Sequence, residues 1–191
     1  LINKIIIVLG YKGNMIKNFV LRKYPKLKFI FIKNKNFTKN NSGQSFYYAY
    51  KKINSNFYIH LNCDCIFTKK HFLKLIKNKK KNLISARSDI LLENKSENIE
   101  AKNNFIKKMV LEKDKKCFFR GYGVAKISKN EMKRNIELYN SLTNSQKLEI
   151  NYYSLIRKNI KHNNYSIIVS DKKNLHEINS QRDLKNCKLA C

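Results

Sequence analysis

Residues 58–67 have the sequence Tyr58-Ile-His-Leu-Asn-Cys-Asp-Cys-Ile-Phe67, in which an apolar run of high β propensity stops at a short polar tip. The tip carries Asp64, an acidic residue in a chain with 13 Asp and Glu against 41 Lys and Arg. Because ligands of α/β folds gather where strands end, Asp64 is a candidate ligand for a divalent cation. In the structural alternative, Asp64 lies in a turn or caps the helix expected from about Lys69.

Around this stretch, apolar runs of strand length alternate with segments whose apolar residues recur at helical spacing. We expect strands at 4–9, 27–32, 57–61 and from 83, helices at 14–24, 43–53 and 69–77, and a polar loop at 34–42. This alternation predicts the α/β class, with a mostly parallel sheet flanked by helices.

The second half of the chain is less regular. It predicts strands at 90–92, 105–111, 121–127 and 165–169, in part antiparallel, and helices at 130–142, 148–160 and 181–189. No internal repeat, Gly/Ser linker or low-complexity tail interrupts the pattern. We therefore expect residues 1–191 to form a single domain.

The net charge of +28 suggests a polyanionic partner. Only six of the 41 basic residues are Arg, however, and proteins that read bases rely on Arg for bidentate contacts. The Lys excess accompanies many Asn, Ile, Phe and Tyr residues, a set favoured by AT-rich codons. Nucleic-acid binding is therefore the alternative hypothesis and not the first.

Cysteine usage and hydropathy bear on the cellular compartment. Five cysteines at irregular spacing point to reduced thiols in a cytoplasmic protein. Cys63 and Cys65 flank Asp64, but one isolated C-x-C is weak evidence for zinc, and we interpret them as packing residues at a strand end. No stretch of 18 apolar residues predicts a membrane span, and Leu1 to Leu9 has the features of a strand and not of a signal peptide.

Five motifs follow one another along nearly the whole chain: Ile5 to Ile16, Lys33 to Tyr48, Leu61-Asn-Cys-Asp64 with Phe67, Gly121 to Ser128, and His176-Glu-Ile-Asn-Ser-Gln-Arg-Asp-Leu184. In this order they resemble the sugar-phosphate nucleotidyltransferases, including their choline-phosphate cytidylyltransferase-like branch. The third motif is similar to that family's Leu-x-Gly-Asp-x-x-Phe, with Cys63 in place of Gly. The last is similar to its closing Glu-Ile-Asp-Thr-x-x-Asp-Leu. The resemblance implies a Rossmann-like nucleotidyltransferase fold.

The resemblance also implies a reaction and a cofactor. A nucleoside monophosphate would move from a nucleoside triphosphate to a small phosphorylated acceptor, such as a sugar 1-phosphate or choline phosphate, with release of pyrophosphate. Mg²⁺ would be held by Asp64, the catalytic carboxylate, and by Asn179. Many members of the family have Asp at the second position, and Asn179 could instead be the N-cap of the terminal helix.

Further site residues follow from the same resemblance. Ser42, Gly43 and Gln44 would contact the nucleotide, or else form only a helix start with Ser42 as its cap. The acceptor would be bound by Glu112, Lys113, Gly121 and Lys126; the alternative for Glu112 and Lys113 is a solvated surface pair. His60 is expected to pack in the sheet and not to act in catalysis.

One departure from the family concerns the triphosphate. Members begin with a strand and a Gly-rich loop carrying Arg, whereas this sequence begins with Leu1 close to the family's second strand and has no Gly-rich phosphate loop among its five glycines. We therefore expect an N-terminally truncated fold, and little transferase activity from these 191 residues alone. An inactive relative and a basic nucleic-acid binder are the other function classes, while the nucleotide, the acceptor and the oligomeric state stay open.

Overall fold

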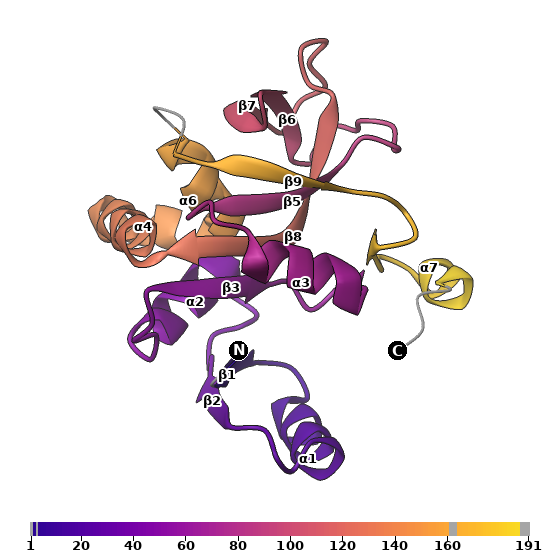
Figure 1. The fold of residues 1–191 in the computed structure, drawn as a ribbon. Coiled ribbons are helices and arrows are strands. Elements are labelled where there is room, and N and C mark those ends of the chain that lie inside the picture. Colours follow the sequence, from indigo (N-terminus) through magenta and orange to yellow (C-terminus); the bar gives the residue numbers. More distant parts are fainter. Residues whose placement is uncertain (1, 3, 161–163, 188–191) are drawn as a thin grey trace. The chain divides into compact units, whose positions relative to one another are not determined.

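The computed structural model describes residue 2, residues 4–160 and residues 164–187 (Figure 1). They fall into two compact units. The first unit comprises Leu1–Ser55 and Met132–Ile156, and the second comprises Asn56–Glu131 and Arg157–Cys191. Within the described ranges, no helix is long and apolar enough to cross a membrane.

The first unit is built on a parallel strand pair. β1 (Ile5–Leu9) and β2 (Phe29–Lys33) are joined by α1 (Gly13–Lys23), and α2 (Ser42–Tyr50) follows. The unit also contains α5 (Asn144–Glu149) and most of α4 (Lys129–Ser141) and α6 (Tyr152–Asn159). Its core includes Phe46 and Tyr152, whose ring centroids lie 4.5 Å apart. By contrast α1 buries none of its residues.

The second unit contains a six-stranded sheet, β3-β8-β5-β9-β7-β6, in which β6 also pairs with β8. The strands are β3 (Phe57–Leu61), β5 (Leu83–Arg87), β6 (Asn98–Lys102), β7 (Phe105–Val110), β8 (Phe119–Ser128) and β9 (Ser166–Ser170). The α/β class with a flanked sheet is confirmed.

The parallel character of the sheet is only partial, which corrects the expectation of a mostly parallel one. In this sheet β5 and β9 are parallel, and the other described pairs are antiparallel. Asn103 and Asn104 connect β6 to β7, both with positive φ, at 51° and 64°. Two such residues favour a tight hairpin turn, and a two-residue connection can only join antiparallel strands.

Helix α3 (Lys69–Lys77) covers the core of this sheet with Leu75, which is fully buried and packs in a cluster with Leu83, Val124, Ile168 and Leu175. The helix has the predicted bounds. Its N-cap is Thr68, whose hydroxyl accepts a hydrogen bond from the amide of His71 at 3.2 Å. The suggestion that Asp64 caps α3 is therefore wrong.

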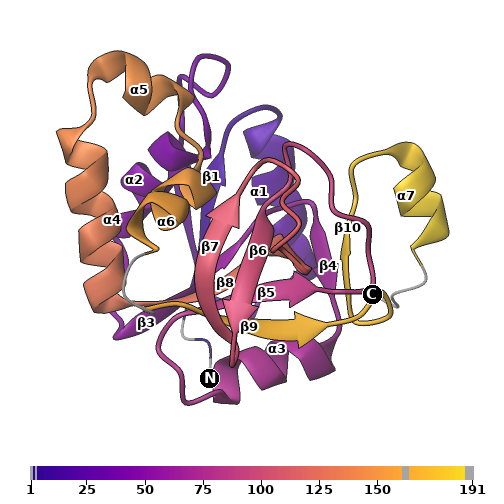
Figure 2. The same cartoon turned by 90° about the horizontal axis from the view of Figure 1, so that it is seen from above.

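A short antiparallel ribbon joins the start of α3 to the C-terminal part of the chain. β4 (Cys65–Phe67) pairs with β10 (Leu175–Glu177), and Figure 2 shows the two side by side, with α7 (Gln181–Asn186) following β10. Thr68 reinforces the ribbon, because its amide donates to the carbonyl of Asn174 at 3.0 Å and its hydroxyl donates to that residue's side chain at 2.9 Å. The ribbon thereby brings the residues around 64 next to those around 177.

Most of the other predicted elements are present, with four differences. Residues 90–92 do not form a strand, and the helix expected at 148–160 is divided into α5 and α6. Strands β4, β6 and β10 were not predicted, because β4 and β10 have only three residues each and β6 has no run of consecutive apolar residues. The terminal helix ends at Asn186, and the last two residues of its expected range lie outside the described residues.

His71 provides a test of this packing through pH. Burial, reinforced by Lys74 and opposed by Asp171, lowers the pKa of His71 from 6.5 to about 4, and its Nε2 lies 2.9 Å from Ser85 Oγ. As the pH falls below 6.5, His71 therefore becomes protonated in the unfolded chain but stays neutral in the native state. The contribution of His71 to the free energy of unfolding is fully present above pH 6.5. It is lost as the pH falls toward 4, and the loss amounts to at most about 3 kcal/mol. We expect His71→Gln, whose amide can still bond to Ser85, to flatten this loss in urea unfolding at pH 7, 5.5 and 4.5; an unchanged slope would contradict it.

Candidate functional site

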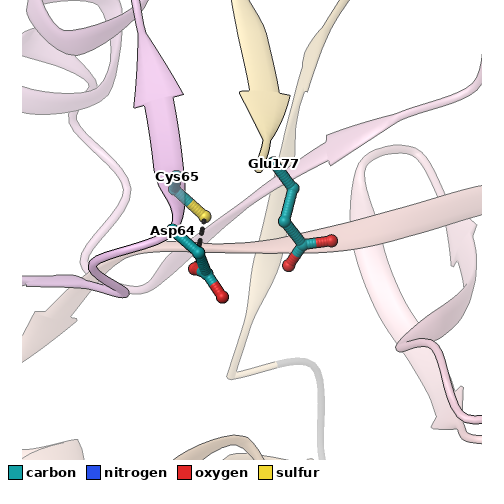
Figure 3. Close-up of side chains that lie close together, drawn as sticks. All are labelled: Asp64, Cys65 and Glu177. Atoms are coloured by element: carbon teal, nitrogen blue, oxygen red, sulfur yellow. Dashed lines mark hydrogen bonds between the residues drawn. The ribbon is translucent and has the colours of Figure 1, made fainter. Parts of the chain in front are cut away.

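Three potential ligands meet at the β4–β10 ribbon. One ligand atom each from Asp64, Cys65 and Glu177 lies within 4.8 Å of the other two (Figure 3). The strand register explains this, because Cys65 is directly opposite Glu177 and the amide of Ile178 donates to the carbonyl of Asp64 at 2.8 Å. We call these three residues the Asp64 cluster.

The polar tip before β4 is fixed by the neighbouring strand β8. The amide of Asn62 donates to the carbonyl of Gly123 at 2.7 Å, and the amide of Cys65 donates back to the carbonyl of Asn62 at 3.3 Å. There is no room for a side chain at Gly123, since an added Cβ would lie 2.4 Å from the Asn62 side chain. Asp64 thus lies on a turn held by backbone hydrogen bonds, where its carboxylate accepts a hydrogen bond from the Cys65 thiol at 3.6 Å.

Glu177 is oriented by two donors. Its Oε2 accepts from Arg120 Nη2 at 3.2 Å and from Asn179 Nδ2 at 3.2 Å. Arg120 is itself placed by Glu93, whose Oε2 accepts from Nη1 at 3.4 Å, and by the Tyr122 ring, 5.8 Å from the guanidinium. The arginine offsets part of the negative charge of the Asp64 cluster.

The chemistry of the donors decides which cation fits. Burial, then the charges of Asp64 and Glu177, raise the pKa of Cys65, so its thiol stays protonated in the absence of a metal. A neutral thiol is a poor metal ligand, whereas the two carboxylates offer the oxygen donors that Mg²⁺ prefers. With a single thiol, the cluster lacks the set of soft ligands typical of structural zinc. Asp64 and Glu177 therefore fit a hard divalent cation.

Asn179 lies beside the Asp64 cluster, where its amide group bonds to Glu177. The N-cap of α7 is Ser180, whose hydroxyl accepts from the amide of Asp183 at 3.2 Å, so the alternative role of Asn179 as the cap is wrong. Coordination of a cation by Asn179 stays a prediction.

The predicted nucleotide-binding residues lie in the first unit, at the start of α2. Asn41 is the N-cap, not Ser42, whose hydroxyl accepts from the amide of Tyr152 at 2.9 Å. Gly43 donates to the carbonyl of Ile150 at 3.1 Å, and a Cβ there would lie 2.6 Å from that oxygen. Gln44 accepts a hydrogen bond from Tyr139. Packing explains this motif without a ligand, and its contact with a nucleotide stays a prediction.

The four predicted acceptor residues are dispersed over the second unit. Glu112 and Lys113 are exposed after β7, where their backbone groups bond to Asn98 and Asn94, as in the surface-pair alternative. Gly121 donates to the carbonyl of Glu97 at 2.7 Å.

The remaining acceptor candidate, Lys126, is buried, and its Nζ donates to the carbonyl oxygens of Ile76 and Asn78 at 3.4 and 2.7 Å. These carbonyls lie at the C-terminal end of α3, whereas the Asp64 cluster lies before its N-terminal end. Binding of an acceptor by any of the four stays a prediction. His60 is half-buried and bonds through Nε2 to Asn62 Oδ1 at 3.1 Å, and burial lowers its pKa to about 4.

Sequence reasoning did not identify two residues of this site, Glu177 and Arg120. Glu177 stands two positions before Asn179 in the closing motif, and its place became clear only from the β4–β10 register. Two sequence features could have identified Arg120: it is one of only six arginines, and it directly precedes the motif that begins at Gly121.

Comparisons with known proteins agree with the fold described above. A family model described as "Domain of unknown function (DUF6564)" matches residues 1–188, and no curated protein matches the chain. Among solved structures, the inositol-1-phosphate CTP transferase from T. maritima is similar, with 17% identity, a TM-score of 0.77, and coverage of 95% of this chain and 72% of that one. The CTP:phosphocholine cytidylyltransferase from Streptococcus pneumoniae has 14% identity and a TM-score of 0.74, over 97% and 77% of the two chains. A putative glucose-1-phosphate thymidylyltransferase from Bacillus anthracis has 11% identity and a TM-score of 0.75, over 97% and 74%. At these identities the likeness establishes the fold.

Proposed function

This chain belongs to the family described as domain of unknown function DUF6564, and we propose that it is a nucleotidyltransferase that moves a nucleoside monophosphate from a nucleoside triphosphate to a small phosphorylated acceptor. The observation that carries the proposal is the convergence of Asp64 and Glu177 at strand ends. Support also comes from the fold, which this chain shares with enzymes named for cytidylyl and thymidylyl transfer.

In the proposed reaction, a phosphate oxygen of the acceptor attacks the α-phosphorus of the triphosphate. A new phosphorus–oxygen bond forms as the bond from the α-phosphorus to the bridging oxygen breaks, and pyrophosphate leaves with the electron pair. Such transfers depend mainly on positioning and on neutralising negative charge. Choline phosphate and sugar 1-phosphates are the acceptor classes named for the similar structures.

The protein's own groups have distinct roles in this proposal. Asp64 and Glu177 would hold Mg²⁺, which would supply positive charge to neutralise and orient the triphosphate. Arg120 positions the Glu177 carboxylate through its 3.2 Å hydrogen bond. The Asn62–Gly123 bond keeps the Asp64 turn rigid, so that the cation site is formed before substrate arrives.

Glu177→Gln tests whether this carboxylate binds the cation. We expect the affinity for Mn²⁺, used as a spectroscopic substitute for Mg²⁺, to fall by roughly 10- to 100-fold in the presence of CTP. The Gln side chain can still accept a hydrogen bond from Arg120, so the arginine should keep its position. The measurement is an electron paramagnetic resonance titration of free Mn²⁺, accompanied by an assay of pyrophosphate release from CTP with phosphocholine or glucose 1-phosphate.

Glu93→Gln is the matched control, because Glu93 also bonds to Arg120 but lies outside the Asp64 cluster. It removes the same charge and should leave Mn²⁺ affinity within about twofold of the wild-type value. Equal losses in the two variants would indicate that Glu177 acts only through Arg120. A wild-type protein that binds neither Mn²⁺ nor any of CTP, UTP, dTTP, GTP and ATP would refute the proposed function.

A further inference from the structure

A cavity of about 400 Å³ lies in the second unit, away from the Asp64 cluster. It is lined by Asn56, Phe57, Lys79, Lys81, Lys126, Ser128, Lys129 and Asn130. Four of these eight residues are lysines and none is acidic. The cavity is therefore a local concentration of positive charge, in addition to the general excess of Lys on this chain.

We call this cavity the lysine pocket, and Lys126 is its buried lysine. It is 7% exposed, and its ammonium group donates to two carbonyls at the end of α3 while lying 4.9 Å from the centroid of the Phe57 ring. These partners are neutral, and no carboxylate lies within ion-pair distance of its Nζ in the described part of the chain. Burial lowers the pKa of Lys126, so an anion in the pocket would offset a real cost of holding this charge.

The other three lysines complete a rim around this buried cation. Lys79 and Lys81 are exposed on the connection between α3 and β5, and Lys129 is exposed at the first position of α4. None of the three forms an ion pair with a described carboxylate. Ser128 contributes to the local order, because its hydroxyl accepts from the amide of Glu131 at 3.3 Å at the start of the same helix.

The lysine pocket and the Asp64 cluster lie at opposite ends of the same elements. Phe57 begins β3, whereas Leu61 ends that strand just before the Asp64 turn. Five strand residues span about 13 Å from the first to the last. Helix α3 separates the two sites in the same way. Lys126 contacts the C-terminal end of this helix, whereas the ribbon with Asp64 precedes its N-terminal end. With nine residues, α3 is about 13 Å long. A small ligand such as pyrophosphate cannot span these distances, so it cannot contact both sites at once.

We propose that the lysine pocket is a second binding site, specific for a small anion that carries one or two phosphate groups. Phosphate oxygens can accept hydrogen bonds from several ammonium groups together, which the four lysines provide at one place. Pyrophosphate, with more charge and more oxygen atoms, binds more tightly than inorganic phosphate. The site does not depend on nucleotidyl transfer and would exist in a protein without that activity.

The test is a titration with inorganic phosphate and, separately, with pyrophosphate, followed by ¹H–¹⁵N NMR. EDTA is present throughout, so that no divalent cation can bring either anion to the Asp64 cluster. We expect saturable shifts at the amides of Asn56, Lys81, Lys126 and Lys129, and no comparable shifts at Asp64 or Glu177. Shifts spread evenly over exposed lysines, or no saturation, would overturn the proposal without the need for any variant.

A matched pair of triple variants gives an independent measurement. Lys79→Gln, Lys81→Gln and Lys129→Gln together should weaken pyrophosphate binding at least tenfold, because they remove the rim and leave the buried cation in place. The control replaces three exposed lysines of the same unit outside the pocket, Lys102, Lys115 and Lys173, and removes the same net charge. It should change affinity less than twofold. Equal weakening in the two triples would show that only the general basic field attracts the anion.

Discussion

Replacing Asp64 with Asn is expected to lower Mn²⁺ affinity in the presence of CTP by on the order of 100-fold or more, with a parallel loss of any nucleotidyl transfer. Asn keeps the size of the side chain and one oxygen, but it removes the charge that attracts the cation. The turn that carries Asp64 should keep its conformation, because the hydrogen bonds that hold it are made by backbone groups. The amide of Ile178 donates to the carbonyl of Asp64, and the amide of Asn62 donates to the carbonyl of Gly123 in β8. The measurement is the Mn²⁺ titration, which gives a result even if turnover is slow.

Thermal unfolding separates loss of binding from loss of structure. Wild-type protein should gain stability as Mn²⁺ and CTP are added, following the binding linkage, whereas the Asp64→Asn protein should not. Without cation the variant should be at least as stable as the wild type, because it removes repulsion between two neighbouring carboxylates.

Asp114→Asn is a suitable control for Asp64→Asn, since Asp114 pairs with Lys108 at 2.7 Å on the surface of the same unit. An exposed pair of this kind contributes little to stability, and Mn²⁺ affinity should be unchanged. If Asp64→Asn bound Mn²⁺ and CTP as the wild type does, the Asp64 cluster would not be the cation site.

Gly123→Ala is expected to lower the free energy of unfolding by about 2–3 kcal/mol and to weaken Mn²⁺ binding as well. The added methyl would lie 2.4 Å from the Cβ, Cγ and Nδ2 of Asn62. Neither strand can easily retreat, because Val124 next to Gly123 is fully buried. Asn62 must therefore leave its position, and the turn that holds Asp64 moves with it. Urea unfolding and the Mn²⁺ titration measure the two effects.

A second substitution shows whether this clash is the cause. Asn62→Gly removes all three atoms that the new methyl would meet, so the double variant Asn62→Gly, Gly123→Ala should be more stable than the sum of the single changes predicts. Additive losses in this double-mutant cycle would contradict the steric explanation, as would wild-type stability of Gly123→Ala alone.

The elements that the sequence predicted well are those with a strong local signal. Helix α3 has its predicted bounds because Thr68 can cap it and its apolar residues recur at helical spacing. The strand direction was harder to foresee, since parallel and antiparallel strands have the same local pattern. The hairpin at Asn103 and Asn104 depends on two residues in the left-handed region, and Asn-Asn is a weaker turn signal than Asn-Gly.

Of the two carboxylates in the candidate site, only Asp64 was predictable from the sequence. Asp64 stands at the end of an apolar run, a pattern that is visible in the sequence, but its partner is determined by which short strands pair. Asn179 was the expected partner, and the structure places Glu177 in the cluster with Asn179 as a hydrogen-bond donor to it. A register between two three-residue strands depends on tertiary packing, which no local pattern reveals.

The β4–β10 ribbon also determines when the site can exist during synthesis of the chain. Cys65 and Glu177 are opposite each other in the ribbon but 112 positions apart in the sequence. At about 5–20 residues per second, the ribosome needs on the order of 6–20 s to add the second residue after the first. During that interval, strand β3 and the turn with Asp64 have been synthesised but Glu177 has not. The nascent protein therefore cannot close the two-carboxylate cluster until synthesis has passed Glu177.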